Sequence, residues 1–253
     1  MTTLEVLFTP AEFVVLKQRD LSETVCVVFD VLRATSTMVT ALGNGADAII
    51  PVADIPEALA IRQRRPEVLL AGERDGVRIE PNLAGGVAFE LGNSPREFTP
   101  EMVRGRTIVM TTTNGTRAMR ACAGARSVMA CSFLNLRATT ELIAGQEIAH
   151  LLLVCSGTHE EAAYEDTLAA GACCDLVWHR FGRGKVADSA GMARRLFHLA
   201  HKDLFEAFSE SRNGRRLLAH PALKEDVAFC ARVDRLHLVA ELTKAGEVRQ
   251  RKA

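Results

Sequence analysis

The chain has few aromatic residues, no excess of either charge and no long hydrophobic run. Lys+Arg and Asp+Glu number 31 each in 253 residues, so no overall basic field attracts nucleic acid and no acidic tail is present. No apolar stretch reaches the roughly 18 residues of a membrane span, and the first eight residues lack the basic and apolar regions of a signal peptide. We expect a soluble, cytoplasmic protein without nucleic-acid or membrane partners.

Cysteine pairs with metal-ligand spacing are also missing. The seven cysteines form no Cys-x-x-Cys pair, and most of them lie inside apolar runs or helical patterns. This placement is typical of small buried hydrophobic residues in a reducing compartment. The sequence therefore disfavours a zinc site and a catalytic thiol.

Short β-rich runs alternate with helical patterns, which indicates an α/β layered fold with a largely parallel, possibly mixed, sheet. No Pro/Gly/Ser-rich linker divides the chain, so residues 1–253 are interpreted as a single domain. After residue 158 the pattern becomes mainly helical and predicts a helical cover. Strands are expected at 5–8, 25–30, 47–52, 68–71, 107–111, 127–131 and 150–155, helices at 55–64, 136–144, 162–181, 189–202 and 204–211, and a last strand-like run at 236–242.

The most informative segment is 25–37, where an apolar strand ends at a carboxylate and continues through an arginine into three hydroxyl residues. We expect Thr35, Ser36 and Thr37 to cap the following helix, whose free N–H groups favour an anion. Arg33 can clamp phosphate oxygens, and Asp30 can hold a cation. This junction predicts a phosphate-binding edge of the sheet.

Two later junctions repeat the pattern of a strand followed by a hydroxyl-rich turn. If the strands are parallel and close together, the three turns converge on one edge and form an anion-binding cleft. Taken singly, such hydroxyls are usually only helix caps. The candidate phosphate-binding residues in these two junctions are Thr112, Thr113, Asn114 and Gly115 in the first, and Ser156 and Gly157 in the second.

Carboxylates near these turns are candidate metal ligands. Glu73 follows the strand 68–71 directly, although its charged loop is equally compatible with plain solvent exposure. Asp166, next to Glu165, heads a small-residue helix that can face the cleft. His159 is a candidate general acid, but isolated histidines are more often structural.

Several familiar motifs are excluded. The segment 43–48 has dinucleotide-like glycine spacing but follows a helix rather than a strand. Ser156 lacks the Gly-x-Ser-x-Gly context of an esterase. Leu32 stands where an Asp-x-Asp phosphatase would have its second aspartate.

Five motifs together resemble the 2-phosphosulfolactate phosphatase family, also called ComB. They occur in order over nearly the whole chain, and the segment from Asp226 to Cys230 followed by Asp234 resembles the family's closing pattern. The motifs are Asp-Val-Leu-Arg-Ala-Thr-Ser-Thr at 30–37, Gly-Glu-Arg-Asp-Gly at 72–76, Leu-Gly-Asn-Ser-Pro at 91–95, Thr-Thr-Thr-Asn-Gly-Thr at 111–116, and Cys-Ser-Gly-Thr at 155–158 with Glu165-Asp166.

The resemblance implies a three-layer α/β/α fold, a homodimer and a Mg²⁺-dependent phosphatase. Such an enzyme converts 2-phosphosulfolactate, a small anionic substrate, to sulfolactate on the way to coenzyme M. The segment 159–161 departs from the resemblance because it carries more charge than we expect there.

A mechanism follows as a hypothesis. Asp30, Glu73 and Asp166 hold Mg²⁺, while Arg33 and the turns bind the phosphoryl oxygens. Arg74, Arg78 or Arg117 pairs with the carboxylate and sulfonate of the substrate. The attacking group is either a metal-bound water or Asp30 itself.

Two other functions remain open at this stage. A non-catalytic phospho-ligand binding protein would keep the hydroxyl turns without needing carboxylates at a metal. A lyase or isomerase could hold the phosphate of a small acid as a handle. Phosphate release separates these alternatives from a phosphatase.

Overall fold

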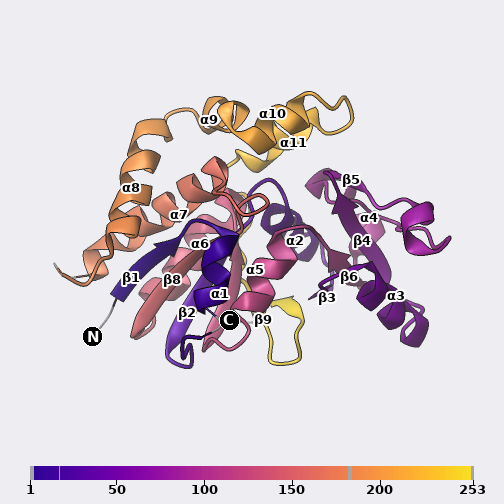
Figure 1. Cartoon of the computed structure of the whole chain (residues 1–253), viewed down its shortest axis with the longest axis horizontal. Helices are drawn as coiled ribbons and strands as arrows, with labels where there is room; N and C mark the ends of the chain where they lie inside the picture. Colours follow the sequence, from indigo (N-terminus) through magenta and orange to yellow (C-terminus); the bar gives the residue numbers. More distant parts are fainter. Residues whose placement is uncertain (1–2, 17, 182–183, 252–253) are drawn as a thin grey trace.

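A ten-stranded mixed sheet with helices on both faces forms the core of the computed structural model, which describes residues 3–16, 18–181 and 184–251 (Figure 1). This confirms the α/β class and the layered helix–sheet–helix arrangement. In spatial order the strands are β1 (Thr3–Leu7), β8 (His150–Cys155), β2 (Thr24–Phe29), β7 (Ser127–Cys131), β9 (Ala240–Leu242), β10 (Val248–Gln250), β3 (Ala48–Pro51), β6 (Thr107–Thr111), β4 (Leu69–Arg74) and β5 (Val77–Arg78).

The sheet consists of two parallel sets joined by the hairpin β9–β10. The first set is β1, β8, β2 and β7, and the second is β3, β6 and β4. Three successive antiparallel pairings, β7 with β9, β9 with β10 and β10 with β3, separate them. The two sets therefore run in opposite directions, so the condition that the three turns follow parallel strands holds for the turns after β2 and β8 but not for the turn after β6.

Three buried clusters explain where the helices lie. A central cluster joins side chains of both strand sets to α2 (Ala34–Gly43) and α5 (Gly115–Ala121). A second cluster packs the other face of the first set against α6 (Leu136–Ala144), α7 (Tyr164–Val177) and α8 (Asp188–Ala200). The third lies between the second set and α3 (Ile55–Arg64). The remaining helices are α1 (Phe13–Leu16), α4 (Pro100–Val103), α9 (Leu204–Glu210), α10 (Arg212–Leu218) and α11 (Lys224–Cys230), with 3₁₀ turns at Pro10–Glu12, Pro81–Ala84, Pro95–Glu97, Phe133–Asn135 and Trp178–Arg180.

Buried runs were the easiest elements to predict. The seven main strands and the helices α3, α6, α7, α8 and α9 are confirmed to within a few residues. The run 236–242 is a strand only from Ala240, because Leu236 N–H donates to the Leu134 carbonyl outside the sheet, at 2.9 Å. The two-residue β5, the polar β10 and the short α10 and α11 were not predicted.

All seven cysteines are free and buried, as predicted. Burial raises the pKa of Cys131, Cys174 and Cys230 to about 12, so these thiols are inert at neutral pH.

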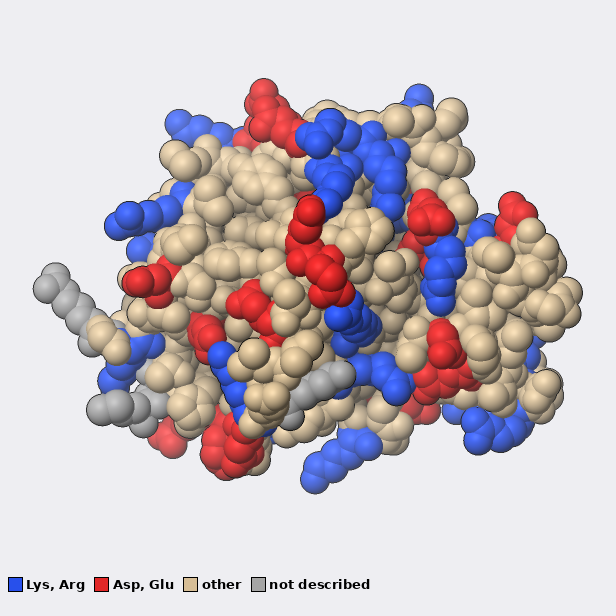
Figure 2. Space-filling view, in the orientation of Figure 1, with Lys and Arg blue, Asp and Glu red and all other residues tan. Residues whose placement is uncertain are grey.

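Charges of both signs are dispersed over the face shown in Figure 2, with no single-sign field. This agrees with the equal numbers of basic and acidic residues in the sequence. Within the described ranges, no helix is both long enough and apolar enough to cross a membrane.

Candidate active site

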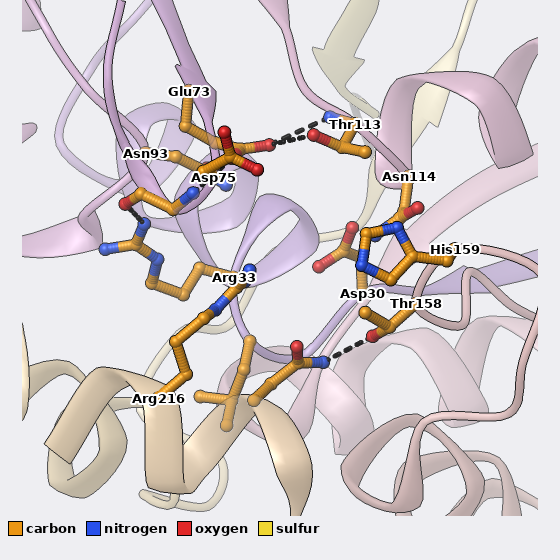
Figure 3. Close-up of a pocket in the computed structure, with 13 residues that line it drawn as sticks. Asp30, Arg33, Glu73, Asp75, Asn93, Thr113, Asn114, Thr158, His159 and Arg216 are labelled. Carbon is orange, nitrogen blue, oxygen red and sulfur yellow. Dashed lines mark hydrogen bonds between the residues drawn. The ribbon is translucent and has the colours of Figure 1, made fainter. Parts of the chain in front are cut away.

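A small polar cavity of about 40 Å³ lies where the carboxyl ends of β2, β4, β6 and β8 approach one another beneath α10. Figure 3 shows it with carboxylates and cationic side chains from different parts of the chain facing one another. Its lining residues are Asp30, Leu32, Arg33, Glu73, Asp75, Gly76, Asn93, Thr113, Asn114, Thr158, His159, Asn213 and Arg216.

Asp30 directly follows β2 and lies four residues before the start of helix α2. Its Oδ1 accepts a hydrogen bond from the Ala34 N–H at 3.0 Å, while the Thr35 hydroxyl donates to the Asp30 carbonyl at 2.9 Å. The prediction that Thr35, Ser36 and Thr37 cap this helix is therefore wrong. Because α2 already begins at Ala34, with Arg33 as its N-cap, these residues lie inside its first turns, and the first helical N–H is satisfied by the Asp30 carboxylate.

The three hydroxyls of this segment are fully buried and point away from the cavity. Ser36 donates to the Val31 carbonyl at 2.8 Å, and Thr37 donates to the Asn93 carbonyl at 2.9 Å. Since each hydroxyl already has an internal acceptor, the segment stabilises the start of α2. The placement of these hydroxyls does not favour a contact with phosphate.

The pKa of Asp30 is raised to about 7, chiefly by burial; the nearby carboxylates of Glu73 and Glu165 contribute to the rise, and the Ala34 N–H bond opposes it. Gly115, at the start of α5, leaves room for the Asp30 carboxylate beside it. A Cβ atom there would lie 2.6 Å from Asp30 Oδ2 and 2.5 Å from the Ala34 side chain. The absence of a side chain at residue 115 thus lets the two helix starts close around the carboxylate.

Glu73 is nearly buried and oriented by three hydrogen bonds. Its Oε1 accepts from the Thr113 N–H and hydroxyl at 2.8 and 2.9 Å, and its Oε2 accepts from the Gly76 N–H at 2.8 Å. Asn93 Oδ1 is buried on the same cavity without a hydrogen-bond partner among the described residues. The cavity is thus lined by a fixed carboxylate from β4 and by an unpaired amide oxygen from the loop before the 3₁₀ turn Pro95–Glu97.

The turns after β6 and β8 divide into residues that face the cavity and residues that do not. Thr113, Asn114 and Thr158 line it. Thr112 instead exchanges hydrogen bonds with Thr116, with its Oγ1 accepting from the Thr116 N–H at 3.2 Å. Ser156 is fully buried and lies off the cavity, and Gly157 also lies outside the lining.

Asp166 lies behind the cavity. Its Oδ1 accepts from the Val31 N–H at 2.8 Å and its Oδ2 from the Gly157 N–H at 3.1 Å, so it ties the turn after β2 to the turn after β8. Burial, with the charges of Glu165 and Asp30, raises its pKa well above the usual range. The structure does not bring this predicted metal ligand onto the cavity.

The predicted substrate arginines also lie elsewhere. Arg74 donates to the Glu73 carbonyl at 2.6 Å, Arg78 pairs with Glu97 at 2.9 Å, and Arg117 pairs with Glu160 at 2.6 Å. None of the three lines the cavity. The cationic groups there are Arg33 and Arg216, and Figure 3 shows the Arg216 side chain reaching from α10 toward its middle.

Arg33 is held by a buried ion pair. It donates from one Nη to Asp226 Oδ2 at 2.7 Å and from the other to the Gly76 carbonyl at 2.5 Å, and both members of the pair are almost fully buried. Ser94 donates to the second Asp226 oxygen at 2.7 Å. Arg33 therefore connects α11 to the turn after β4 and orders the cavity wall.

Replacing Asp226 by alanine is expected to lower the free energy of unfolding by about 3–5 kcal/mol, because Arg33 would be left buried without its counter-charge. Urea denaturation measures this. In the matched control, Glu160→Ala, which removes an exposed partner of Arg117, should cost less than about 1 kcal/mol. Equal effects of the two variants would contradict the structural role of the buried pair.

The sequence reasoning missed Asp75, Asn93, Asn213 and Arg216 as cavity residues. Asp75 is part of the charged loop already noted, and its φ of 54° marks the tight turn between β4 and β5. Asn213 and Arg216 come from the helical cover, and no local sequence pattern predicts which of its residues face the sheet. His159 does line the cavity, with a φ of 58°.

The cavity can be tested for its fit to a divalent cation. Among the described residues no three His, Cys, Asp or Glu side chains form a metal-binding group. Mg²⁺ does not need such a cage, since it commonly uses one or two carboxylates, water and substrate phosphate. Asp30, Glu73 and the unpaired Asn93 Oδ1 form an oxygen-only donor set that fits this chemistry.

The same chain is similar in sequence to known proteins over most of its length. A protein from Thermotoga petrophila is 41% identical over 216 residues, covering 85% of this chain and 88% of its own. Proteins from Caldicellulosiruptor saccharolyticus and a Synechococcus species are 37% and 38% identical, each over 87% of this chain and 90% and 89% of their own. All three carry the name probable 2-phosphosulfolactate phosphatase. The profile of the 2-phosphosulpholactate phosphatase family matches residues 12–245, and the chain therefore belongs to that family.

Proposed function

We propose that this protein is a phosphoric monoester hydrolase that cleaves 2-phosphosulfolactate to sulfolactate and phosphate in this cavity. The observation that carries the proposal is the pairing of two fixed carboxylates, Asp30 and Glu73, with the guanidinium of Arg216 across one small polar cavity. Carboxylates suit a cation that binds phosphate, and guanidinium suits the anionic groups of the substrate. Membership of the family supports the same reaction.

Mg²⁺ is the proposed cofactor, held by Asp30 and Glu73 with Asn93 Oδ1 as a further oxygen donor. When bound, it would neutralise charge on the phosphoryl oxygens. The protein's own groups supply the orientation. Glu73 is locked by Thr113 and Gly76, and Asp30 by the start of α2.

The attacking oxygen belongs either to water or to Asp30. A carboxylate with a pKa near 7 is partly protonated at neutral pH and is then a poor nucleophile, whereas a neighbouring cation lowers that pKa. Hydrolysis in ¹⁸O-labelled water with an acid quench distinguishes the routes. A trapped aspartyl phosphate supports Asp30 as nucleophile, and its absence with single-step label entry supports water.

Purified protein incubated with 2-phosphosulfolactate is expected to release phosphate with Mg²⁺ and to lose this activity in chelator. Phospholactate and other phosphorylated 2-hydroxy acids serve as comparison substrates. Binding without phosphate release would favour the non-catalytic alternative. Conversion of the substrate with its phosphate retained would favour a lyase or isomerase.

Arg216→Ala is expected to reduce kcat/KM for 2-phosphosulfolactate by about 100-fold, because a charged group on the substrate loses its guanidinium partner. The loss should be smaller for a phosphate ester that lacks carboxylate and sulfonate. The matched control is Arg215→Ala, the neighbouring exposed arginine, which does not line the cavity. Equal losses on both kinds of substrate would assign Arg216 to the phosphate instead.

The homodimer, the cytoplasmic location and a place in coenzyme M biosynthesis remain predictions from the family resemblance. Sedimentation equilibrium of the purified chain measures the first.

A further inference from the structure

Asn213 connects three elements that are far apart in sequence. Its Nδ2 donates to Thr158 Oγ1 at 2.7 Å and to Glu165 Oε1 at 2.6 Å. It thereby joins α10 to the turn after β8 and to the first turn of α7. All three side chains are at least nine-tenths buried, with exposures of 5%, 4% and 1% for Asn213, Thr158 and Glu165.

The backbone around Asn213 fixes its position. Ser211 caps α10 by accepting from the Gly214 N–H at 3.0 Å. A Cβ on Gly214 would lie 1.7 Å from the Phe208 carbonyl oxygen, so only glycine allows α9 and α10 to meet this closely. Asn213 is therefore presented from a rigid corner of the helical cover.

The hydrogen bonds around Thr158 determine whether its hydroxyl hydrogen is free to donate. The Asn213 amide uses its two N–H groups as donors, one to Glu165 Oε1 and one to Thr158 Oγ1. Thr158 Oγ1 consequently accepts, and its own hydrogen is left to donate. Within the described part of the chain no acceptor is within hydrogen-bond reach of that hydrogen, while Thr158 lines the cavity beside Asp30.

We propose that Asn213 is a positioning residue of the active site, which holds the Thr158 hydroxyl as a hydrogen-bond donor to a phosphoryl oxygen of the substrate. Thr158 contacts the substrate and Asn213 orients the Thr158 hydroxyl. The buried Glu165 holds Asn213 in place by accepting its second N–H. The inference rests on the proposed function and adds a donor that the carboxylates and Arg216 do not supply.

A double-mutant cycle with Asn213→Ala and Thr158→Val tests the proposal. Each single variant is expected to lower kcat/KM for phosphate release by about tenfold, and the double variant should be no worse than Thr158→Val by more than about twofold. The same pattern is expected in the affinity for inorganic phosphate, measured by calorimetry. Thr158→Ser should recover most of the loss caused by Thr158→Val because it restores the hydroxyl.

Asn135→Ala is the matched control, since Asn135 is a fully buried amide whose bonds reach Thr139 and the Leu238 carbonyl, outside the cavity. It should lower the melting temperature without lowering phosphate affinity. Multiplicative effects in the double variant, or normal phosphate affinity in Thr158→Val, would overturn the proposal.

The two inferences fail in different ways. A wild-type protein that binds phosphate but releases none from any ester disproves the proposed function. The phosphate affinities of the variants then still decide the role of Asn213. A wild-type protein that neither binds nor releases phosphate disproves both.

Discussion

Phosphate release is expected to fall by about a thousandfold when Asp30 is replaced by asparagine, the largest effect we expect from a single substitution. Asparagine keeps the shape of the side chain and can still accept the Ala34 N–H bond at the start of α2. It lacks the negative charge needed to hold a cation or to attack phosphorus. Steady-state phosphate release in saturating Mg²⁺ measures the loss, and calorimetry with Mg²⁺ alone separates weakened cation binding from lost chemistry.

The same substitution is expected to stabilise the metal-free protein at neutral pH. Burial raises the pKa of Asp30 from 3.8 to about 7, so between these values the folded state binds a proton that the unfolded state does not. Asp30 therefore makes the wild-type protein lose stability as pH rises from about 4 to 7, and the variant lacks this contribution. Above pH 7 the difference in unfolding free energy should be on the order of 4 kcal/mol in favour of the variant.

Chemical denaturation in chelator at several pH values measures this difference. Asp20→Asn is the matched control, because Asp20 is fully exposed and the Ser22 N–H bond lowers its pKa, so its removal should not abolish the loss of stability with rising pH. Full activity in Asp30→Asn, or a stability difference that does not grow with pH, would contradict the assigned position of this carboxylate.

The elements predicted best are those that a continuous run of apolar residues marks as buried. The runs Val25–Phe29 in β2 and Leu151–Cys155 in β8 are apolar on both faces, and this pattern is typical of strands covered by helices on each side. The opposite directions of the two strand sets could not be predicted, since they depend on the hairpin β9–β10 near the end of the chain. Its strands have three residues each and alternate too briefly to be recognised.

The candidate site divides in the same way. Asp30, Glu73, Thr113 and Asn114 lie at or just after the ends of buried strands, and the structure places all four on the cavity. The hydroxyls at 35–37 have the same sequence signal, but a sequence pattern does not tell whether a hydroxyl finds an internal acceptor. Arg216 is missed because a surface arginine on a short helix looks like any solvated charge until the helical cover is placed.

The opposed strand directions also explain why the cavity is lined by residues from both strand sets. Asp30 and Thr158 follow strands of the first set, whereas Glu73 lies near the end of β4 and Thr113 follows β6, both in the second set. The carboxyl ends of the two sets meet around the starts of α2 and α5, which lie in the central cluster shared by both sets. The site is therefore formed by the contact between these two helix starts, and that contact should be sensitive to very small changes in volume.

Gly115→Ala tests this sensitivity and is expected to lower kcat/KM by about 100-fold. Helix propensity alone would favour alanine by roughly 1 kcal/mol. The added methyl group, however, would lie 2.5 Å from the Ala34 side chain and 2.6 Å from Asp30 Oδ2, so the two helix starts must separate and displace the carboxylate. Overpacking of this kind costs about 1–3 kcal/mol of stability, which outweighs the propensity gain.

Phosphate-release kinetics and urea denaturation measure the two effects of Gly115→Ala. Gly124→Ala is the matched control, because a Cβ there meets no atom within 4 Å and the residue is exposed. That variant should keep wild-type activity and stability. If Gly115→Ala instead remained fully active, the close packing of α5 against Asp30 would not be required for catalysis. If it lost stability but not activity, Asp30 would be held in place by its bond to the Ala34 N–H alone.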